Sequence, residues 1–326
     1  MPDGCVITIG TFDGVHMGHR AILAEARRLA TAHGTKVVAL AFDPHPASIL
    51  RPEHEPPRLT TPDEKCSALR HAGADEVELI EPTRQLLDQS PETFIQSLVD
   101  TMGIKAIAEG ANFRFGRDRR GDAATLRWIG ERIGFEFAEV SPVRVTLCDQ
   151  WSVQVSSSLI RWLLEQGRVA DASRCLGRSY GLSGSVVAGA RRGRTIGVPT
   201  ANVDPLVTRQ VMIPADGVYG GTVSVAGRGR HPAAISIGVK PTFADGGRVV
   251  EAHLIDFDGD LYGKNIRVET VRWLREQRRF KTVELLQAQL QRDIARTRRL
   301  GEQGLLEVSA ARRGHTAGCV TAPPTA

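Results

Sequence analysis

Cysteine is scarce in this chain and never closely paired. Five cysteines are scattered over 326 residues, their number is odd, and no CxxC pair occurs. This pattern indicates a reducing compartment and argues against a disulfide framework or a zinc site.

Long apolar runs are also missing, and no internal repeat is visible. Nothing approaches the roughly 18 consecutive apolar residues of a membrane-spanning helix. The chain also begins with a short strand-like run in place of a signal peptide. We therefore expect a cytoplasmic protein without a membrane partner.

Charge of one sign does not dominate either. The formal net charge is +5, and apolar residues make up 41% of the chain, which is ample for buried cores. A mild basic excess suits anionic ligands, nucleotides included, but does not by itself indicate nucleic acid. We expect small-molecule substrates and no nucleic acid, and the sequence assigns no oligomeric state.

The first half of the chain, from Cys5 to about Gly177, alternates strand-like and helical patterns. Its apolar runs are CVITI, KVVALAF, EVELIE, KAIAE and FEFAEV. A helical stripe over 19–33 closes on Gly34, and Thr61 to Glu64 has the form of a capping box. Repeated strand–helix–strand units predict an α/β domain with a doubly wound parallel sheet, which binds ligands at the carboxyl ends of its strands.

After Gly177 the pattern changes. From Tyr180 to about Arg275, β-like runs follow one another closely, punctuated by glycine and without helices. This pattern predicts an antiparallel β-barrel. One amphipathic helix follows, with an apolar side made of Val283, Leu286, Leu290 and Ile294. We predict domains over residues 1–178 and 179–303, and a disordered tail over 304–326.

The stretch TIGTFDGVHMGH directly follows the first strand. Its glycines, Gly10, Gly14 and Gly18, allow the backbone to approach a ligand. His16 and His19 flank the expected helix start, where an anion is favoured, and both can donate to phosphate oxygens. Zinc ligands on a helix are usually four apart, but two ordinary surface histidines remain an alternative.

A second stretch, VSSSLIR, places three hydroxyls before an arginine. Ser156, Ser157, Ser158 and Arg161 could grip phosphates at another helix start. Plain N-capping by serine is the alternative. Together the two stretches resemble nucleotidyltransferases of the HxGH type.

The resemblance narrows when two further stretches are included. GTFDGVHMGH, FDPHP (42–46), GANFRFG (110–116) and VSSSLIR (155–161) resemble, in order and spacing, four signatures of one family. That family is the bacterial bifunctional riboflavin kinase/FAD synthetases, and the signatures belong to its FMN adenylyltransferase half. Two positions depart from the usual pattern: Ser158 stands for threonine, and Thr11 for asparagine or serine.

This resemblance implies roles for individual residues. His16 and His19 would be catalytic as well as ATP-binding. Pro44, His45 and Pro46 would lie at the flavin phosphate, although His45 taken alone indicates a rigid surface turn. The implied ATP-binding set is Gly10, Phe12, His16, His19, Asn112, Ser156, Ser157, Ser158 and Arg161.

In the second half, GRTIGVPTANV (193–203) is compact and glycine-rich. Thr200 and Asn202 offer hard oxygen ligands suited to Mg²⁺, although composition alone favours a strand-terminal turn. Glu251 lies on an alternating strand, where a lone carboxylate is more often exposed than catalytic.

Several stretches of the second half resemble motifs of the riboflavin kinase half of the same family. GRTIGVPTAN, GVYGG, ISIGVKPTF, VEAHLIDFDGDLYGK and LREQRRF occur in its order. The resemblance implies a six-stranded barrel, Mg²⁺-ATP on Thr200 and Asn202, and Glu251 as base for the 5′-hydroxyl of riboflavin. The implied ATP-binding residues are Gly193, Arg194, Gly197, Pro199, Thr200 and Asn202.

Two departures occur in this half. Val198 replaces an aromatic residue, and Ala190 stands where an acidic residue is frequent; either could loosen ATP affinity without removing a chemical role. The sequence thus predicts an enzyme that converts riboflavin to FMN and FMN to FAD. A nucleotidyltransferase with another acceptor, or a flavin-binding regulator without catalysis, are the alternatives.

Overall fold

The computed structural model describes residues 4–189, 197–239 and 247–306. The chain forms two compact units. The first is Met1–Arg144 with Gln154–Ser157, and the second is Val145–Val153 with Ser158–Ala326.

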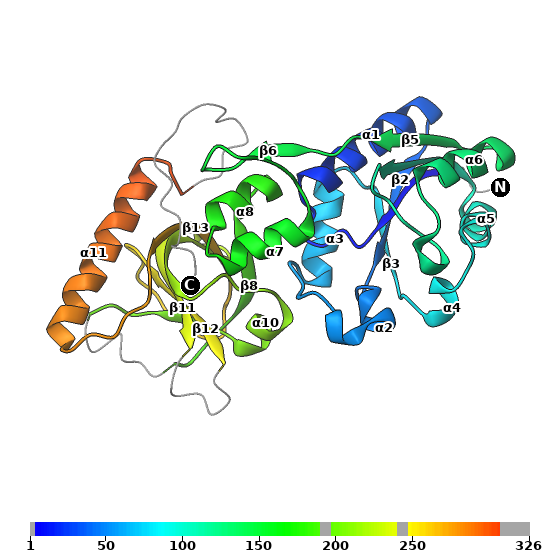
Figure 1. Cartoon of the computed structure of the whole chain (residues 1–326). Helices are drawn as coiled ribbons and strands as arrows, with labels where there is room; N and C mark the ends of the chain where they lie inside the picture. The colour runs from blue at the N-terminus through cyan, green and yellow to red at the C-terminus, as the bar shows by residue number, and fades with distance from the viewer. Residues whose placement is uncertain (1–3, 190–196, 240–246, 307–326) are drawn as a thin grey trace. The chain divides into compact units, whose positions relative to one another are not determined.

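The first unit is built on a five-stranded sheet whose paired strands all run parallel, as predicted. The strand order is β3-β2-β1-β4-β5, and Figure 1 labels β2, β3 and β5 of this sheet. The strands are β1 (Cys5–Gly10), β2 (Lys36–Phe42), β3 (Glu76–Ile80), β4 (Ile104–Gly110) and β5 (Glu136–Val140). The order reverses direction between β1 and β4, so the loops after these two strands lie at the switch point where such sheets take ligands.

Helices cover both faces of this sheet. Helices α1 (Met17–His33) and α3 (Pro62–His71) pack on the face that carries Val6. Helices α5 (Pro91–Met102) and α6 (Ala123–Ile133) pack on the face that carries Ile7. Adjacent strand residues point to opposite faces, so the continuous apolar runs of the strands fill two cores. Short helical turns complete the unit: α2 (Ala47–Leu50), η1 (Pro52–His54), α4 (Arg84–Leu87) and η2 (Arg117–Arg119).

Local sequence signals fix the helix ends. Gly34 adopts a left-handed conformation with φ of 62° and bonds back to the last turn of α1. Thr61 and Glu64 form both hydrogen bonds of a capping box at the start of α3. Both predictions are confirmed.

The second unit contains a closed barrel with the strand order β10-β11-β12-β9-β8-β13. The strands are β8 (Tyr180–Val187), β9 (Ala201–Val203), β10 (Gly217–Val225), β11 (Gly229–Val239), β12 (Arg248–Leu254) and β13 (Asn265–Arg275). All neighbouring strands are antiparallel, which confirms the predicted barrel.

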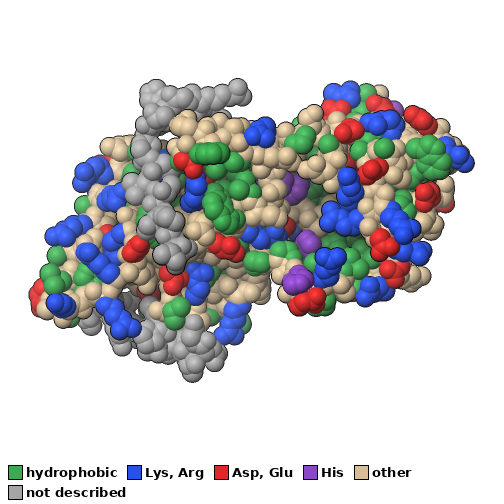
Figure 2. Space-filling view, viewed as in Figure 1, with side chains coloured by type: hydrophobic (Ala, Val, Ile, Leu, Met, Phe, Trp, Pro, Cys, Tyr) green, Lys and Arg blue, Asp and Glu red, His purple; other side chains and the backbone are tan. Residues whose placement is uncertain are grey.

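Helix α11 (Val283–Glu302) follows the barrel and packs on it, with Ile294 in a cluster with Val198 and Ile255. Of the predicted tail, the first residues form a turn in which Leu306 is 2% exposed, and residues 307–326 lie outside the described residues. The remaining elements are β6 (Arg144–Thr146), β7 (Ser152–Gln154), α7 (Ser157–Glu165), α8 (Val169–Leu176) and α10 (Pro205–Gln210). On the face shown in Figure 2, basic side chains of both units are interspersed with acidic ones.

Candidate active sites

The β1–α1 loop has an unusual backbone. Phe12 and Val15 have φ of 46° and 38°, in the left-handed region that side chains with a Cβ rarely adopt, and Gly14 has φ of 80°. Such conformations cost roughly 1–3 kcal/mol each and concentrate at functional sites. The strain therefore marks the loop that carries the first motif.

His16 and His19 lie at the start of α1, as their spacing predicts. His16 is the N-cap, and its Nδ1 accepts a hydrogen bond from the His19 N–H at 3.3 Å. The two rings stack with centroids 3.6 Å apart, and the Phe12 ring meets His19 edge-on at 5.1 Å. His16 is 6% exposed, so this histidine is not an ordinary surface residue. Because His16 accepts at Nδ1, the proton of its neutral ring is on Nε2.

Two glycines of the motif pack closely against rings of the same motif. A Cβ on Gly18 would lie 3.1 Å from His16 Cε1, and one on Gly10 would lie 3.2 Å from the Phe12 ring. The sequence had indicated that these glycines admit a ligand. Close packing against their own loop is an additional reason for them.

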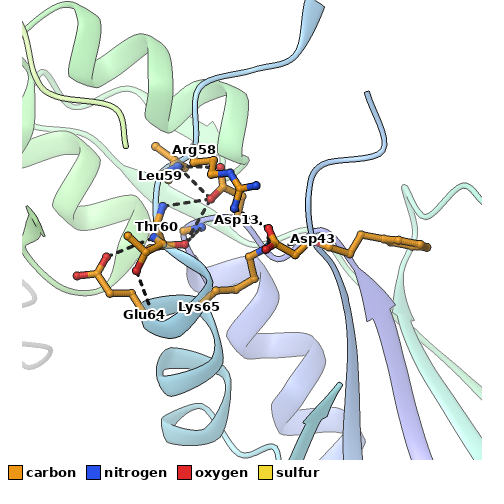
Figure 3. Close-up of polar contacts among 10 residues, drawn as sticks. Asp13, Asp43, Arg58, Leu59, Thr60, Glu64 and Lys65 are labelled. Atoms are coloured by element: carbon orange, nitrogen blue, oxygen red, sulfur yellow. Dashed lines mark hydrogen bonds and ion pairs between the residues drawn. The ribbon is translucent and has the colours of Figure 1, made fainter. Parts of the chain in front are cut away.

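Asp13 anchors the same loop, and the sequence analysis missed it. Its buried carboxylate accepts hydrogen bonds from the Leu59 N–H at 3.0 and 2.9 Å and from the Thr60 N–H at 3.2 Å (Figure 3). The Thr60 hydroxyl also donates to it, at 3.4 Å. The carboxylate thereby fixes the loop to the segment that leads into α3.

The serine motif reaches the same loop through one residue. The Ser157 hydroxyl donates to the Asp13 carbonyl oxygen at 2.8 Å, across 144 residues of sequence. Ser156 belongs to the first unit as well, whereas Ser158 and Arg161 continue into α7 in the second unit. Their contribution to an ATP site stays a prediction.

The other two motifs of this half follow neighbouring strands. Asn112 lies in the loop after β4, which pairs with β1. Pro44, His45 and Pro46 follow β2, on the other side of β1. Since the sheet is parallel, all these loops leave the same edge.

Hydrogen bonds hold the loop of His45. Its Nδ1 accepts from the Ala47 N–H at 3.0 Å at the start of α2. Asp43 forms ion pairs with Arg58 at 2.7 Å and with the buried Lys65 at 3.4 Å (Figure 3). Ion pairs of Asp43, which follows β2, with Arg58 before α3 and Lys65 in α3 thus fix the backbone of the predicted flavin contacts.

In the barrel, strand register brings the predicted kinase residues together. Asn202 on β9 lies directly opposite Glu251 on β12, and Glu251 lies opposite Ser236 on β11. Residues directly opposite one another on antiparallel strands share a face. Gly189 leaves room here, since a Cβ on it would lie 2.5 Å from Asn202 Nδ2.

These residues line one cavity of about 490 Å³, within the range of ligand pockets. Pro199, Thr200, Asn202 and Glu251 all contribute to it. Its apolar wall comes partly from α11, and includes Phe257, Phe280, Leu286, Leu290 and Ile294. The cavity therefore combines a polar row of side chains with an apolar wall that suits a planar aromatic ring.

Ser236 and Gln277 also line this cavity, although no motif of the sequence indicates them. The Gln277 amide donates to the Ser236 Oγ at 3.0 Å and to the Ile237 carbonyl oxygen at 2.8 Å. Ser236 is recognisable only from its register opposite Glu251. Val198, one of the noted departures, is 3% exposed and belongs to the wall of this cavity.

Some predicted kinase residues are not located. Gly193, Arg194 and the departure Ala190 lie outside the described residues, whereas Gly197 is described, with φ of 75°. For the predicted Mg²⁺, Thr200 and Asn202 supply oxygen atoms beside the carboxylate of Glu251, and such a donor set fits a hard cation. In the described parts of the chain, no three His, Cys, Asp or Glu side chains cluster as metal ligands would.

Comparison with known proteins agrees with this two-part architecture. Residues 1–158 match the family model for FAD synthetase, and residues 176–300 match that for riboflavin kinase. The bifunctional riboflavin kinase/FMN adenylyltransferase of Escherichia coli K12 is 37% identical over 89% of this chain and 91% of its own length. The protein of the same name from Bacillus subtilis is 30% identical over 88% of this chain and 90% of its own.

A solved structure also spans both units. A Streptococcus pneumoniae protein called a macrolide-efflux protein superposes with a TM-score of 0.82 at 30% identity, covering 91% of this chain and 95% of that one. Over the described ranges of the present chain, no helix is long and apolar enough to cross a membrane.

The parallel-sheet unit and the barrel unit match the two domains of an enzyme that joins a nucleotidyltransferase to a kinase. The chain belongs to the family of bifunctional riboflavin kinase/FMN adenylyltransferases. It is thereby an enzyme of FAD biosynthesis that works through FMN.

Proposed function

We propose that the barrel cavity phosphorylates riboflavin and that the carboxyl edge of the parallel sheet adenylylates FMN. The observation that carries the kinase assignment is the register of Asn202 opposite Glu251 on the wall of one cavity. The adenylyltransferase assignment is supported by the stacked histidines at the start of α1 and by the Ser157–Asp13 hydrogen bond between two motifs.

In the kinase step, Glu251 accepts the proton of the 5′-hydroxyl of riboflavin as that oxygen attacks the γ-phosphorus of ATP. General-base assistance of this kind contributes roughly 10²–10⁴-fold. Thr200 and Asn202 would hold Mg²⁺, which would neutralise charge on the phosphates of ATP. The apolar wall of the cavity excludes water from the flavin side.

In the second step, the phosphate of FMN attacks the α-phosphorus of a second ATP, and pyrophosphate leaves. His16 donates from Nε2, because its Nδ1 is already an acceptor for the His19 N–H. His19 stabilises the charge that develops on the leaving group. Ser156, Ser157, Ser158, Arg161 and Asn112 hold the nucleotide, and Pro44, His45 and Pro46 contact the flavin phosphate.

The domain boundary, the cellular location and the partners predicted from the sequence are also part of this proposal. The two activities divide near residue 178, residues 309–326 are dispensable for both, and both reactions occur in the cytoplasm. The partners are small molecules, with no nucleic acid and no membrane. The mixed charges on the face in Figure 2 are in keeping with small substrates.

One incubation tests the proposal. Purified protein with riboflavin, ATP and Mg²⁺ should yield FMN and then FAD, separated by chromatography. FMN that never becomes FAD would remove the adenylyltransferase assignment and favour another acceptor. Flavin that binds without turnover would favour a non-catalytic regulator.

A further inference from the structure

Strands β1 and β4 part before either strand ends. They pair as far as Ile7 opposite Ile107. β1 nevertheless stays paired with β2 up to Gly10, and β4 stays paired with β5 up to Gly110. The gap therefore opens between the two central strands, at the edge where the strand order reverses.

Glu109 fills this gap with a carboxyl group. Its Oε1 accepts hydrogen bonds from the Ile9 N–H at 2.5 Å and from the Thr8 hydroxyl at 3.0 Å, and the residue is 2% exposed. Burial raises the pKa of Glu109 to about 8, and these two donors, together with the nearby Gly110 N–H, offset that rise only in part.

The surroundings of Glu109 are neutral. The groups that act on it are hydrogen-bond donors of β1 and β4, and no charged side chain of the described residues contributes to its pKa shift. The clusters on the two sheet faces, under α1 and α3 and under α5 and α6, are apolar. Both hydrogen bonds end on Oε1, so a proton on Oε2 leaves them in place but removes the negative charge that strengthens them.

Both neighbours of this contact lead into predicted ATP-binding loops. Ile9 directly precedes Gly10 of the first motif, and Glu109 directly precedes Gly110 of the GANFRFG motif. We propose that Glu109 is a positioning residue for FMN adenylylation, whose ionised carboxylate links these two loops and whose protonation loosens the link. The inference rests on the adenylylation proposed above.

A pH profile of both activities on one protein tests this. The kcat/KM for FAD formation from FMN and for FMN formation from riboflavin is measured between about pH 6 and pH 10. Adenylylation should rise with pH through an ionisation near the pKa of about 8 of Glu109. The phosphate of FMN titrates at about 6, which separates it from this ionisation.

Glu109→Gln keeps the shape and mimics the protonated acid. This variant should lack the ionisation and remain near the low-pH rate of the unaltered protein at every pH. Its riboflavin phosphorylation should follow the unaltered profile, which also shows that the variant is folded.

Thr8→Val supplies a directional test. It removes one donor that lowers the pKa of Glu109, so the midpoint of the adenylylation profile should move to higher pH. A merely structural contact would lower the rate or the stability and leave the midpoint where it was.

Each outcome decides the role of Glu109. The proposed role is wrong if the adenylylation profile of the unaltered protein shows no ionisation near the pKa of Glu109. It is also wrong if Glu109→Gln or Thr8→Val leaves the midpoint of that profile unchanged. If Glu109→Gln loses both activities through misfolding, the Thr8→Val midpoint decides alone. A protein that makes no FAD from FMN at any pH contradicts the proposed function itself, which is a distinguishable result.

Discussion

The two candidate sites are assembled in different ways. In the first unit, loops from distant parts of the chain meet at one sheet edge and are fixed by anchors such as Asp13 and Ser157. In the barrel, Asn202, Glu251 and Ser236 lie in one row because their strands are paired in register. A loop site therefore depends on residues that never touch the substrate, whereas a strand site depends mainly on the reacting groups.

The largest effect is expected from Glu251→Gln. The substitution preserves shape and removes the base, so riboflavin phosphorylation should fall by about 10²–10⁴-fold. Adenylylation of added FMN should persist, since that phosphate is already ionised. Both rates are measured on one purified variant.

A matched control is Glu269→Gln, a carboxylate of the same barrel that pairs with Arg230 at 2.9 Å and does not line the cavity. It should change phosphorylation little. Near-normal FMN production by Glu251→Gln would leave positioning alone as the source of catalysis.

His19→Ala should have the next largest effect, confined to the other activity. Loss of one transition-state donor costs about 10²–10³-fold, so FMN should accumulate from riboflavin while FAD formation nearly stops. His33→Ala, at the far end of the same helix and paired with Glu136 at the surface, is the control. Equal loss of both activities in a folded His19→Ala protein would contradict two separate sites.

Asp13→Asn tests the anchoring of the loop site. Weakening charge-assisted bonds to the Leu59 and Thr60 amides should lower the free energy of unfolding by about 1.5–3 kcal/mol. Misplacement of the histidines should also lower adenylylation roughly 10–10²-fold while phosphorylation stays normal. Thermal melts and both rates measure this.

Asp75→Asn serves as its control. Asp75 also accepts a backbone N–H, that of Val37, but before β3 at the opposite sheet edge. The Asp75 side chain, which forms an ion pair with Arg27, is 41% exposed. The substitution should therefore lower the free energy of unfolding by less than about 1 kcal/mol and leave both activities unchanged. Asp13→Asn with a lower melting point but unchanged adenylylation would make the anchor purely structural.

The smallest effect is expected from removing residues 309–326. The match to the kinase family ends at residue 300. Both activities should keep their rates, measured side by side with the full chain. A marked drop in either one would give the tail a role in catalysis or folding.

Local signals made much of the fold predictable. The helix ends at Gly34 and Thr61 follow from chemistry within one turn, and the strands follow from their apolar runs. The histidine spacing likewise indicated a helix start. Such features need no knowledge of distant parts of the chain.

Features that depend on distant pairing were not predictable. Asp13 meets Leu59 across 46 residues, and Glu109 meets Ile9 across 100, through a strand order that the sequence does not state. Ser236 became recognisable from its register opposite Glu251. A single sequence carries the residue types of these contacts but not their partners.

The short strand β9 has a consequence for local opening of the barrel. It has three residues, whereas the other barrel strands have seven to eleven. It is joined to β12 by two residue pairs and to β8 by two. Strands held by so few backbone hydrogen bonds open at lower free energy than the whole domain.

A nucleotide that bridges Thr200 and Asn202 to Glu251 would bind only where β9 is closed. Such a ligand stabilises the closed form by about 2.7 kcal/mol at a hundredfold excess over its dissociation constant. Substrate occupancy and barrel closure are then linked equilibria, and amide hydrogen exchange in β9 reports both.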